Sequence, residues 1–166
     1  MNIIIFGPPG AGKGTQSKFI VNKFNLYQLS TGDLLRGEIK NKTKLGLEIS
    51  SIINSGELVS DEIVSNLIEK FISNDTYKQK INIVLKLSVS LETVKKRILE
   101  RQILEKRPDD NADIAIKRYK TYEKSSEPVI DYYKQSNLLK VVNGEAGISE
   151  INSEISDLID AIKGWL

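Results

Sequence analysis

The chain alternates between short apolar runs and longer stretches in which apolar positions recur at helical spacing. Three β-branched-rich runs predict buried strands at 2–6, 81–89 and 138–142, and a shorter run predicts another strand at 26–29. Apolar residues three and four positions apart predict amphipathic helices between these strands. The expected helices span 15–24, 31–39, 45–53, 61–72, 90–105, 110–133 and 148–162.

Strands that alternate with helices favour one class of fold. They predict an α/β domain in which a parallel sheet is flanked by helices through right-handed crossovers. A chain of 166 residues is long enough for one such domain with a sizeable core. Pro128 lies inside the longest helical stretch, where it predicts a break or a kink.

A glycine-rich loop separates the first strand from the first helix. Residues 7–15 read GPPGAGKGT, which fits the P-loop pattern GxxxxGK, with the hydroxyl of Thr15 one position later than usual. Glycines in such a loop let backbone N–H groups surround a phosphate, and the following helix adds its positive end. Lys13 is then the side chain that reaches the β- and γ-phosphates. A tight turn without a ligand is the alternative, which the strand-loop-helix context disfavours.

Composition excludes several kinds of chemistry. The sequence has no cysteine and no histidine, so disulfides, thiolate nucleophiles, imidazole bases and the common zinc sites are absent. A formal net charge of +2 gives no indication of a nucleic-acid partner. No apolar run approaches the roughly 20 residues that cross a bilayer. We therefore expect a cytoplasmic protein that binds neither membrane nor nucleic acid.

Arginine is rare and its positions are informative. Of the 24 lysines and arginines only five are arginine, which leaves 19 lysines. A solvated surface has no preference between the two cations, whereas the planar guanidinium binds phosphate or carboxylate in a bidentate way. Ordinary salt bridging is the alternative for any single arginine. The five are Arg36, Arg97, Arg101, Arg107 and Arg118.

The motif GPPGAGKGT, together with LSTGDLLR at 29–36, resembles the adenylate kinases, a family of nucleoside-monophosphate kinases. The resemblance implies a single P-loop kinase domain over 1–166. Its core would comprise 1–29, 60–101 and 108–166, with a small helical NMP-binding subdomain at 30–59. Only five residues separate Arg101 from Arg107, which is the spacing of the short-lid members and implies a lid loop at 102–107.

The same resemblance implies two nucleotide sites. ATP would contact Gly10, Ala11, Gly12, Lys13, Gly14, Thr15, Arg97, Arg101 and Ala146. AMP would contact Thr31, Arg36, Glu57, Leu58, Val59, Arg107 and Arg118. The catalytic set would be Lys13, Arg97, Arg101, Arg107 and Arg118, which align the phosphates and stabilise the charge of the migrating group.

The implied reaction is reversible transfer of the γ-phosphoryl group of ATP to AMP, which gives two ADP. Mg²⁺ would accompany ATP without a direct protein ligand, with Asp33 as a partner through water, and no zinc is expected. The family resemblance also implies a monomer. Two alternatives remain open: a kinase for UMP, CMP or another monophosphate, although Thr31 favours AMP, and an ATP-binding module with impaired catalysis.

One part of the family pattern is missing. The family has a strand that ends in DG(Y/F)PR, followed by a helix, whereas here Tyr77 is separated from Ile81 by only three residues. The missing part would supply an aspartate near the magnesium, a phosphate-binding arginine and a glutamine that reads adenine. Its loss also removes a strand from the middle of the sheet and leaves backbone groups of both neighbours unpaired. We therefore hypothesise that the natural polypeptide contains a further stretch here.

Overall fold

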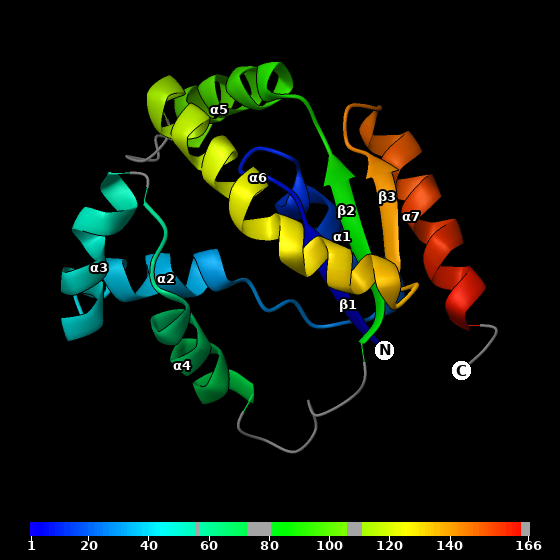
Figure 1. The fold of residues 1–166 in the computed structure, drawn as a ribbon, viewed down its shortest axis with the longest axis horizontal. Helices are drawn as coiled ribbons and strands as arrows, with labels where there is room; N and C mark the ends of the chain where they lie inside the picture. The colour runs from blue at the N-terminus through cyan, green and yellow to red at the C-terminus, as the bar shows by residue number, and fades with distance from the viewer. Residues whose placement is uncertain (56, 73–80, 106–110, 164–166) are drawn as a thin grey trace.

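The fold is a parallel sheet with helices on both of its faces (Figure 1). The computed structural model describes residues 1–55, 57–72, 81–105 and 111–163. In these residues the strands are β1 (Asn2–Phe6), β2 (Ile81–Ser88) and β3 (Leu139–Asn143), in the spatial order β1-β2-β3. The expected α/β class is confirmed. The helices are α1 (Lys13–Phe24), α2 (Thr31–Lys40), α3 (Lys44–Asn54), α4 (Asp61–Ile72), α5 (Leu91–Glu105), α6 (Ala112–Gln135) and α7 (Ile148–Lys163).

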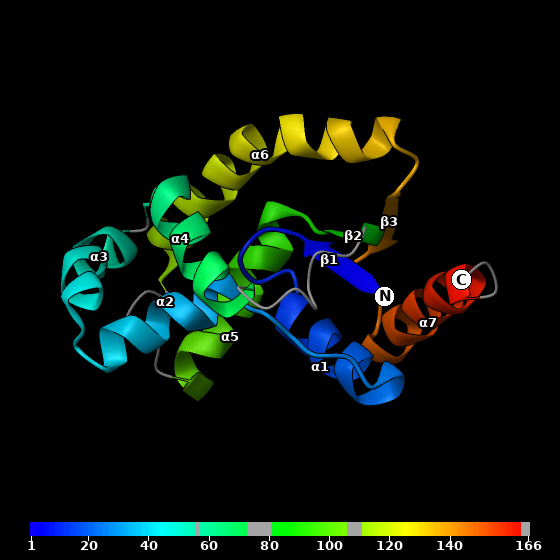
Figure 2. The same ribbon diagram turned by 90° about the horizontal axis from the view of Figure 1, so that it is seen from below.

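The core is centred on β2. Figure 2 shows α6 over one face of the sheet and α1 with α7 over the other, so a central strand is covered on both sides. Ile83, Val84, Leu85 and Leu87 of β2 are accordingly at most 1% exposed. Every residue of β1, by contrast, is only half-buried. The continuous apolar run at the start of β2 is typical of a central parallel strand.

Short polar side chains set the beginnings of several helices. The Ser30 hydroxyl accepts from the N–H of Asp33 at the start of α2, and the Thr43 hydroxyl accepts from that of Gly46 at the start of α3. Asn111 does the same for α6. Each oxygen satisfies one N–H group that the first helical turn leaves without a partner. The expected helices therefore appear within one or two residues of their predicted ends.

The expected strand at 26–29 is wrong. Asn25 turns the chain through a left-handed conformation at the end of α1, and residues 26–30 then run without regular structure. Tyr27 is 79% exposed. A strand needs a neighbour for its backbone groups, and in the described part of the chain β1 pairs with β2 alone. Without an intervening strand beside β1, this segment has nothing to pair with.

Pro128 does not break its helix. Of the expected break or kink, the structure has the second: one helix, α6, continues on both sides of the proline. Figure 2 shows that the axis of α6 bends along its length, as expected where a proline removes one backbone hydrogen bond. The bend lets α6 pass from α5 at one end to the sheet at the other.

Helices α2 and α3 pack against each other beyond the sheet (Figure 1). In the ranges that the model describes, no helix combines the length and apolar character needed to cross a membrane.

Gly37 of α2 and Gly46 of α3 differ in the space that they leave for a methyl side chain. A Cβ atom at Gly46 of α3 would lie far inside van der Waals contact with the backbone of Glu38, whereas one at Gly37 would have no atom within 4 Å. We expect Gly46→Ala to lower the free energy of unfolding by about 1–3 kcal/mol through overpacking. Gly37→Ala, the matched control, should raise it by about 0.5–1 kcal/mol through helix propensity. Urea unfolding followed by circular dichroism measures both, and equal effects would contradict this packing.

Candidate functional site

The loop between β1 and α1 has the backbone of an anion-binding turn. Gly10 and Gly12 adopt left-handed φ angles of 80° and 92°, which non-glycine residues rarely adopt. The N–H of Ala11 donates to the carbonyl of Pro8 at 3.1 Å and closes the loop. Helix α1 begins at Lys13 without a side-chain cap, so its first N–H groups are left for a ligand. A Cβ atom at Gly14 would meet open space.

Lys13 folds back onto this loop. Its Nζ donates to the carbonyl oxygens of Gly7 at 2.6 Å and Pro8 at 3.0 Å. Burial and the positive charge of Arg101 lower the pKa of Lys13 to about 8. Both causes oppose the ammonium form, and a bound phosphate would reverse them. The loop thus holds a cation that an anion would stabilise.

A cavity of about 510 Å³ opens beside the loop. Its lining comes from segments far apart in the sequence: the loop, the start of α2, residues 57–59 and one face of α6. It therefore unites residues that the sequence assigns to ATP with residues assigned to AMP. The predicted site residues among its lining are Lys13, Thr31, Arg36, Glu57, Leu58, Val59 and Arg118.

The arginines around this cavity are held by protein oxygens. Arg36 donates to the Asp33 carboxylate at 2.5 Å, and Arg118 donates to the carbonyl of Ile53 at 2.9 Å. Lys117, next to Arg118, bonds the Glu57 carboxylate at 3.2 Å. Helix α6 is thereby fastened to the segment that carries the proposed AMP contacts.

Two predicted ATP residues outside the cavity, Arg97 and Ala146, follow the carboxyl ends of β2 and β3, whereas Gly10, Ala11, Gly12, Gly14 and Thr15 lie in the loop after β1 and at the start of α1. Arg97 of α5 donates to the carbonyl of Gly144 at 2.8 Å, in the loop that contains Ala146. Arg101 lies near enough to Lys13 for its charge to lower the lysine pKa. Arg107 falls at 106–110, outside the described residues. The sequence did not predict the contact between Arg97 and Gly144. This contact holds the loop that contains Ala146 against α5.

Glu145 is a functional candidate that the sequence analysis missed. Its carboxylate accepts from the N–H of Ser90 at 2.9 Å and the hydroxyl of Thr93 at 2.8 Å, at the start of α5. The Ser90 hydroxyl, the Ser90 N–H and the Thr93 hydroxyl, with a smaller contribution from the charge of Arg97, lower the pKa of Glu145 to about 2. Ser90 begins the helix that the sequence predicts at 90–105. The carboxylate that accepts from its N–H belongs to a loop 55 residues away, so the sequence pattern does not reveal it.

Asp33 is not placed for direct metal binding. Its carboxylate pairs with Arg36, and no group of three metal-ligating side chains occurs in the ranges that the structure describes. Mg²⁺ prefers to keep several waters and to bind substrate phosphates. The residues present therefore fit a metal that arrives on a nucleotide, with Asp33 reaching it only after exchanging its partner.

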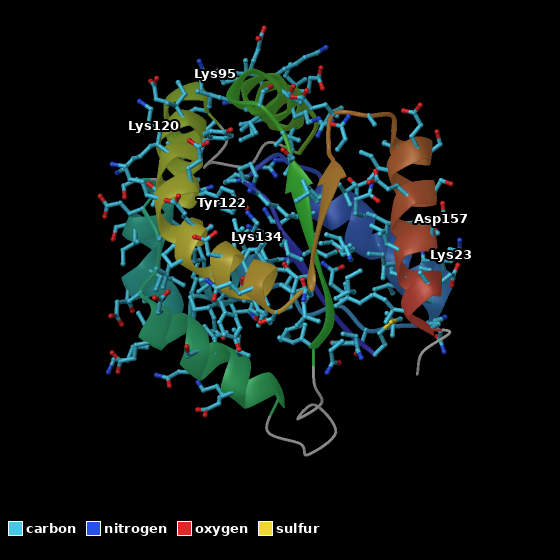
Figure 3. The ribbon with its side chains drawn as sticks, turned by 45° about the vertical axis from the view of Figure 1, so that its right-hand side comes forward. Lys23, Lys95, Lys120, Tyr122, Lys134 and Asp157 are labelled. Atoms are coloured by element: carbon cyan, nitrogen blue, oxygen red, sulfur yellow. The ribbon has the colours of Figure 1, made fainter. Side chains whose placement is uncertain are left out.

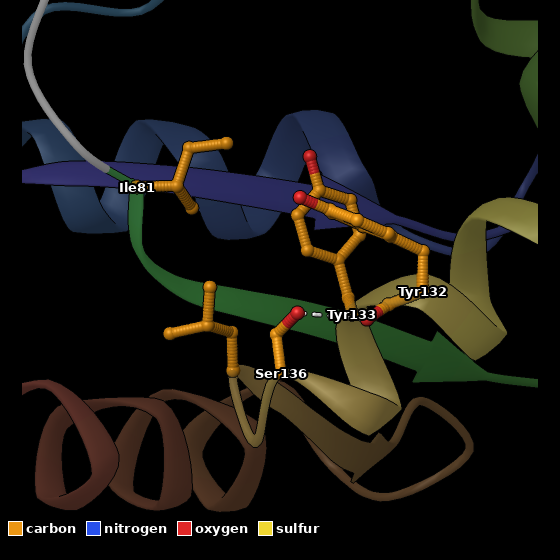
Figure 4. Close-up of a pocket in the computed structure, with 5 residues that line it drawn as sticks. Ile81, Tyr132, Tyr133 and Ser136 are labelled. Atoms are coloured by element: carbon orange, nitrogen blue, oxygen red, sulfur yellow. Dashed lines mark hydrogen bonds between the residues drawn. The ribbon is translucent and has the colours of Figure 1, made fainter.

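A second cavity, of about 370 Å³, lies at the amino ends of β2 and β3 (Figure 4). Ile81, Leu138 and the rings of Tyr132 and Tyr133 line it, and Ser136 bonds the backbone of α6 at 2.9 Å. None of the predicted site residues that the structure describes borders this cavity. Ligands of open parallel sheets bind at the carboxyl ends of the strands, so the larger cavity is the candidate site.

The lowered pKa of Lys13 predicts a pH dependence for binding of ATP, the nucleotide that the resemblance implies. Phosphate favours the ammonium form, so binding raises the lysine pKa and takes up a proton above pH 8. We expect ATP affinity to fall by up to about tenfold per pH unit above pH 8. Calorimetry in buffers of different ionisation enthalpy measures both effects. Lys13→Arg should bind more weakly but without this decline, and a wild-type profile that stays flat to pH 10 would contradict it.

Comparison with known proteins identifies relatives. The family model for adenylate kinase matches residues 5–80. An adenylate kinase of Pelagibacter ubique is 36% identical, with 96% of this chain and 99% of the relative covered. One from Porphyromonas gingivalis is 34% identical, with 98% and 97% covered, and one from Leptospira biflexa is 35% identical, with 92% and 96% covered.

The relatives are longer within the aligned region. The alignment with the Porphyromonas gingivalis protein has 189 positions but takes in 98% of 166 residues, or about 163, so about 26 positions have no residue here. This difference has the size of a strand and a helix, and among the described strands β1 has a neighbour on one side only. Even with that gap, similarity at this level extends over nearly all of both chains, and the chain therefore belongs to the adenylate kinase family.

Proposed function

We propose that this protein catalyses reversible transfer of the γ-phosphoryl group of ATP to AMP, giving two ADP. The observation that carries the proposal is the 510 Å³ cavity, whose lining joins Lys13 of the phosphate-binding loop to Arg36 and Arg118. A protein that only binds ATP has no need of two further guanidinium groups on the far side of its phosphate loop. Donor and acceptor phosphates would meet between these cations.

Catalysis in this site would be a matter of alignment and charge. Phosphoryl transfer needs the two oxygens in line and the charge of the migrating group stabilised, and it needs no covalent intermediate. Lys13 and Arg101 would hold the donor phosphates, and Arg36 and Arg118 the acceptor phosphate. Arg107, a further phosphate ligand in the resemblance, remains part of the proposal.

The free protein holds these cations with exchangeable partners. Arg36 is paired with Asp33 at the surface, where the side chains are 39% and 64% exposed. Ion pairs this exposed contribute little to stability, so Arg36 can leave Asp33 for a phosphate at small cost. The metal would be Mg²⁺ bound to the phosphates of ATP, where it neutralises negative charge.

Water must be kept from the migrating group, because it competes with AMP as acceptor. We propose that the subdomain at 30–59 and the lid at 102–107 close over the nucleotides. The contacts of Arg118 with Ile53 and of Lys117 with Glu57 support a part of this, since they already join α6 to that subdomain. The proposal includes the cytoplasm as compartment and a monomer as assembly state, as the resemblance implies.

The decisive test is ADP formation from ATP with AMP, CMP, UMP or GMP as acceptor, followed by a coupled assay. We expect turnover with AMP in preference to the other three. Arg118→Lys keeps the charge but loses the planar fork, so kcat should fall by about 10²–10³-fold. Lys120→Met, a control at an exposed residue on the other side of α6, should change kcat little. Normal ATP binding without turnover would replace this proposal with an ATP-binding module.

Glu145 should affect the donor site alone. Because its carboxylate and Arg97 hold the loop at 143–147 on α5, Glu145→Ala should raise KM for ATP by about three- to tenfold and leave KM for AMP unchanged. The folded-state pKa of Glu145 lies below its usual value, so its stabilising effect is complete above pH 4.5 and is lost as the pH falls towards 2. Initial rates at pH 7 measure the first effect, and an equal rise in both KM values would refute it.

A further inference from the structure

A buried hydroxyl group in the acceptor cavity has no hydrogen-bond partner. Tyr122 of α6 lines the cavity together with Lys13, Arg36 and Arg118. Its hydroxyl oxygen is shielded from solvent and makes no hydrogen bond within the part of the chain that the structure describes. Figure 3 shows Tyr122 on the side of α6 that faces the sheet, whereas Lys120 projects from the opposite side.

Other hydroxyl groups of α6 are satisfied. The Tyr119 hydroxyl donates to the carbonyl of Val89 at 3.2 Å, and the Ser125 hydroxyl donates to the carbonyl of Thr121 at 2.8 Å. Leaving a buried hydroxyl unpaired costs free energy, and nearly all buried polar groups in folded proteins have a partner. Three buried side-chain oxygens have no partner among the described residues, those of Gln16, Tyr122 and Asn152, and of these residues Tyr122 alone lines the cavity. Its place in the wall of the cavity indicates a ligand.

The position of Tyr122 on the helix indicates which part of the ligand it meets. It follows Arg118 by four residues, so the two side chains are neighbours on one face of α6. Burial raises the pKa of the phenol, although the Ser126 hydroxyl lies near enough to oppose this in part without completing a hydrogen bond. The phenol thus remains a donor throughout the pH range of the reaction. A phosphate dianion only accepts, which makes it the complementary group.

We propose that the Tyr122 hydroxyl donates a hydrogen bond to a phosphate oxygen of the acceptor monophosphate, beside the Arg118 guanidinium. This rests on the proposed function and adds a neutral donor to its set of cations. A neutral donor strengthens phosphate binding without adding to the repulsion among Lys13, Arg36 and Arg118. Tyr122 is therefore an acceptor-binding residue, and its ring also fills the space between α6 and the sheet.

Tyr122→Phe removes the hydroxyl and little else. We expect the affinity for AMP, measured by calorimetry on the nucleotide-free protein, to fall about tenfold, which is the effect of losing one hydrogen bond to a charged group. KM for AMP should rise to a similar extent while KM for ATP stays unchanged. Thermal stability of the nucleotide-free variant should be equal to or above that of the wild type, because a buried unpaired group is lost.

Tyr119→Phe is the matched control. Its hydroxyl has a protein partner, so its removal should lower thermal stability and leave AMP affinity unchanged. Equal AMP affinity of the wild type and Tyr122→Phe would overturn the assignment, as would an equal loss of affinity for adenosine, which has no phosphate. A wild-type protein that binds no AMP would instead refute the proposed function itself, so the two failures are distinguishable.

Discussion

The cations that surround one cavity repel each other, and the rest of the site depends on the oxygen atoms that offset this repulsion. Around the cavity, loop carbonyls hold Lys13, Asp33 holds Arg36 and the Ile53 carbonyl holds Arg118, while outside it the Gly144 carbonyl holds Arg97. These partners are neutral or exposed, so they hold the cations without neutralising the site. Burial and, to a smaller extent, repulsion from Arg101 lower the pKa of Lys13 to about 8. A phosphate removes this repulsion, and binding therefore draws on energy stored in the free fold.

The sheet shows what happens when one strand is missing from a layered fold. Because β1 lies at the edge of the described sheet, the full burial of a central strand occurs at β2 instead. Residues 26–30 have no neighbouring strand to pair with and form no regular structure. The phosphate loop nevertheless keeps its form. Its geometry depends on the turn between β1 and α1 and on close packing of Gly10 against Ile98, neither of which involves the exposed edge.

Local patterns predicted most of the elements because their signals are local. The stripe of apolar residues from Asp61 to Ile72 and the capping serine before it predict α4 to the residue. The strand expected at 26–29 fails because pairing is a long-range property that its own residues do not encode. Glu145 and Tyr122 were missed for the same reason, since capping a helix 55 residues away and facing a cavity are both products of the tertiary fold. The arginines could be predicted as site residues because their rarity among the cations is itself a sequence signal.

Helix α6 links the two halves of the site. Near its start, Lys117 and Arg118 hold the segment around Ile53 and Glu57, while Tyr119 bonds the carbonyl of Val89 at the end of β2. Val89 directly precedes Ser90, whose N–H donates to Glu145 in the donor loop. The acceptor segment therefore contacts Lys117 and Arg118 directly, and the donor loop is connected to Tyr119 through Val89 and Ser90. A movement of α6 that follows phosphate binding at Arg118 would thus reach Val89 directly. The bend of α6 along its length separates the first turns, which hold the acceptor segment, from the last turns, which pack on the sheet.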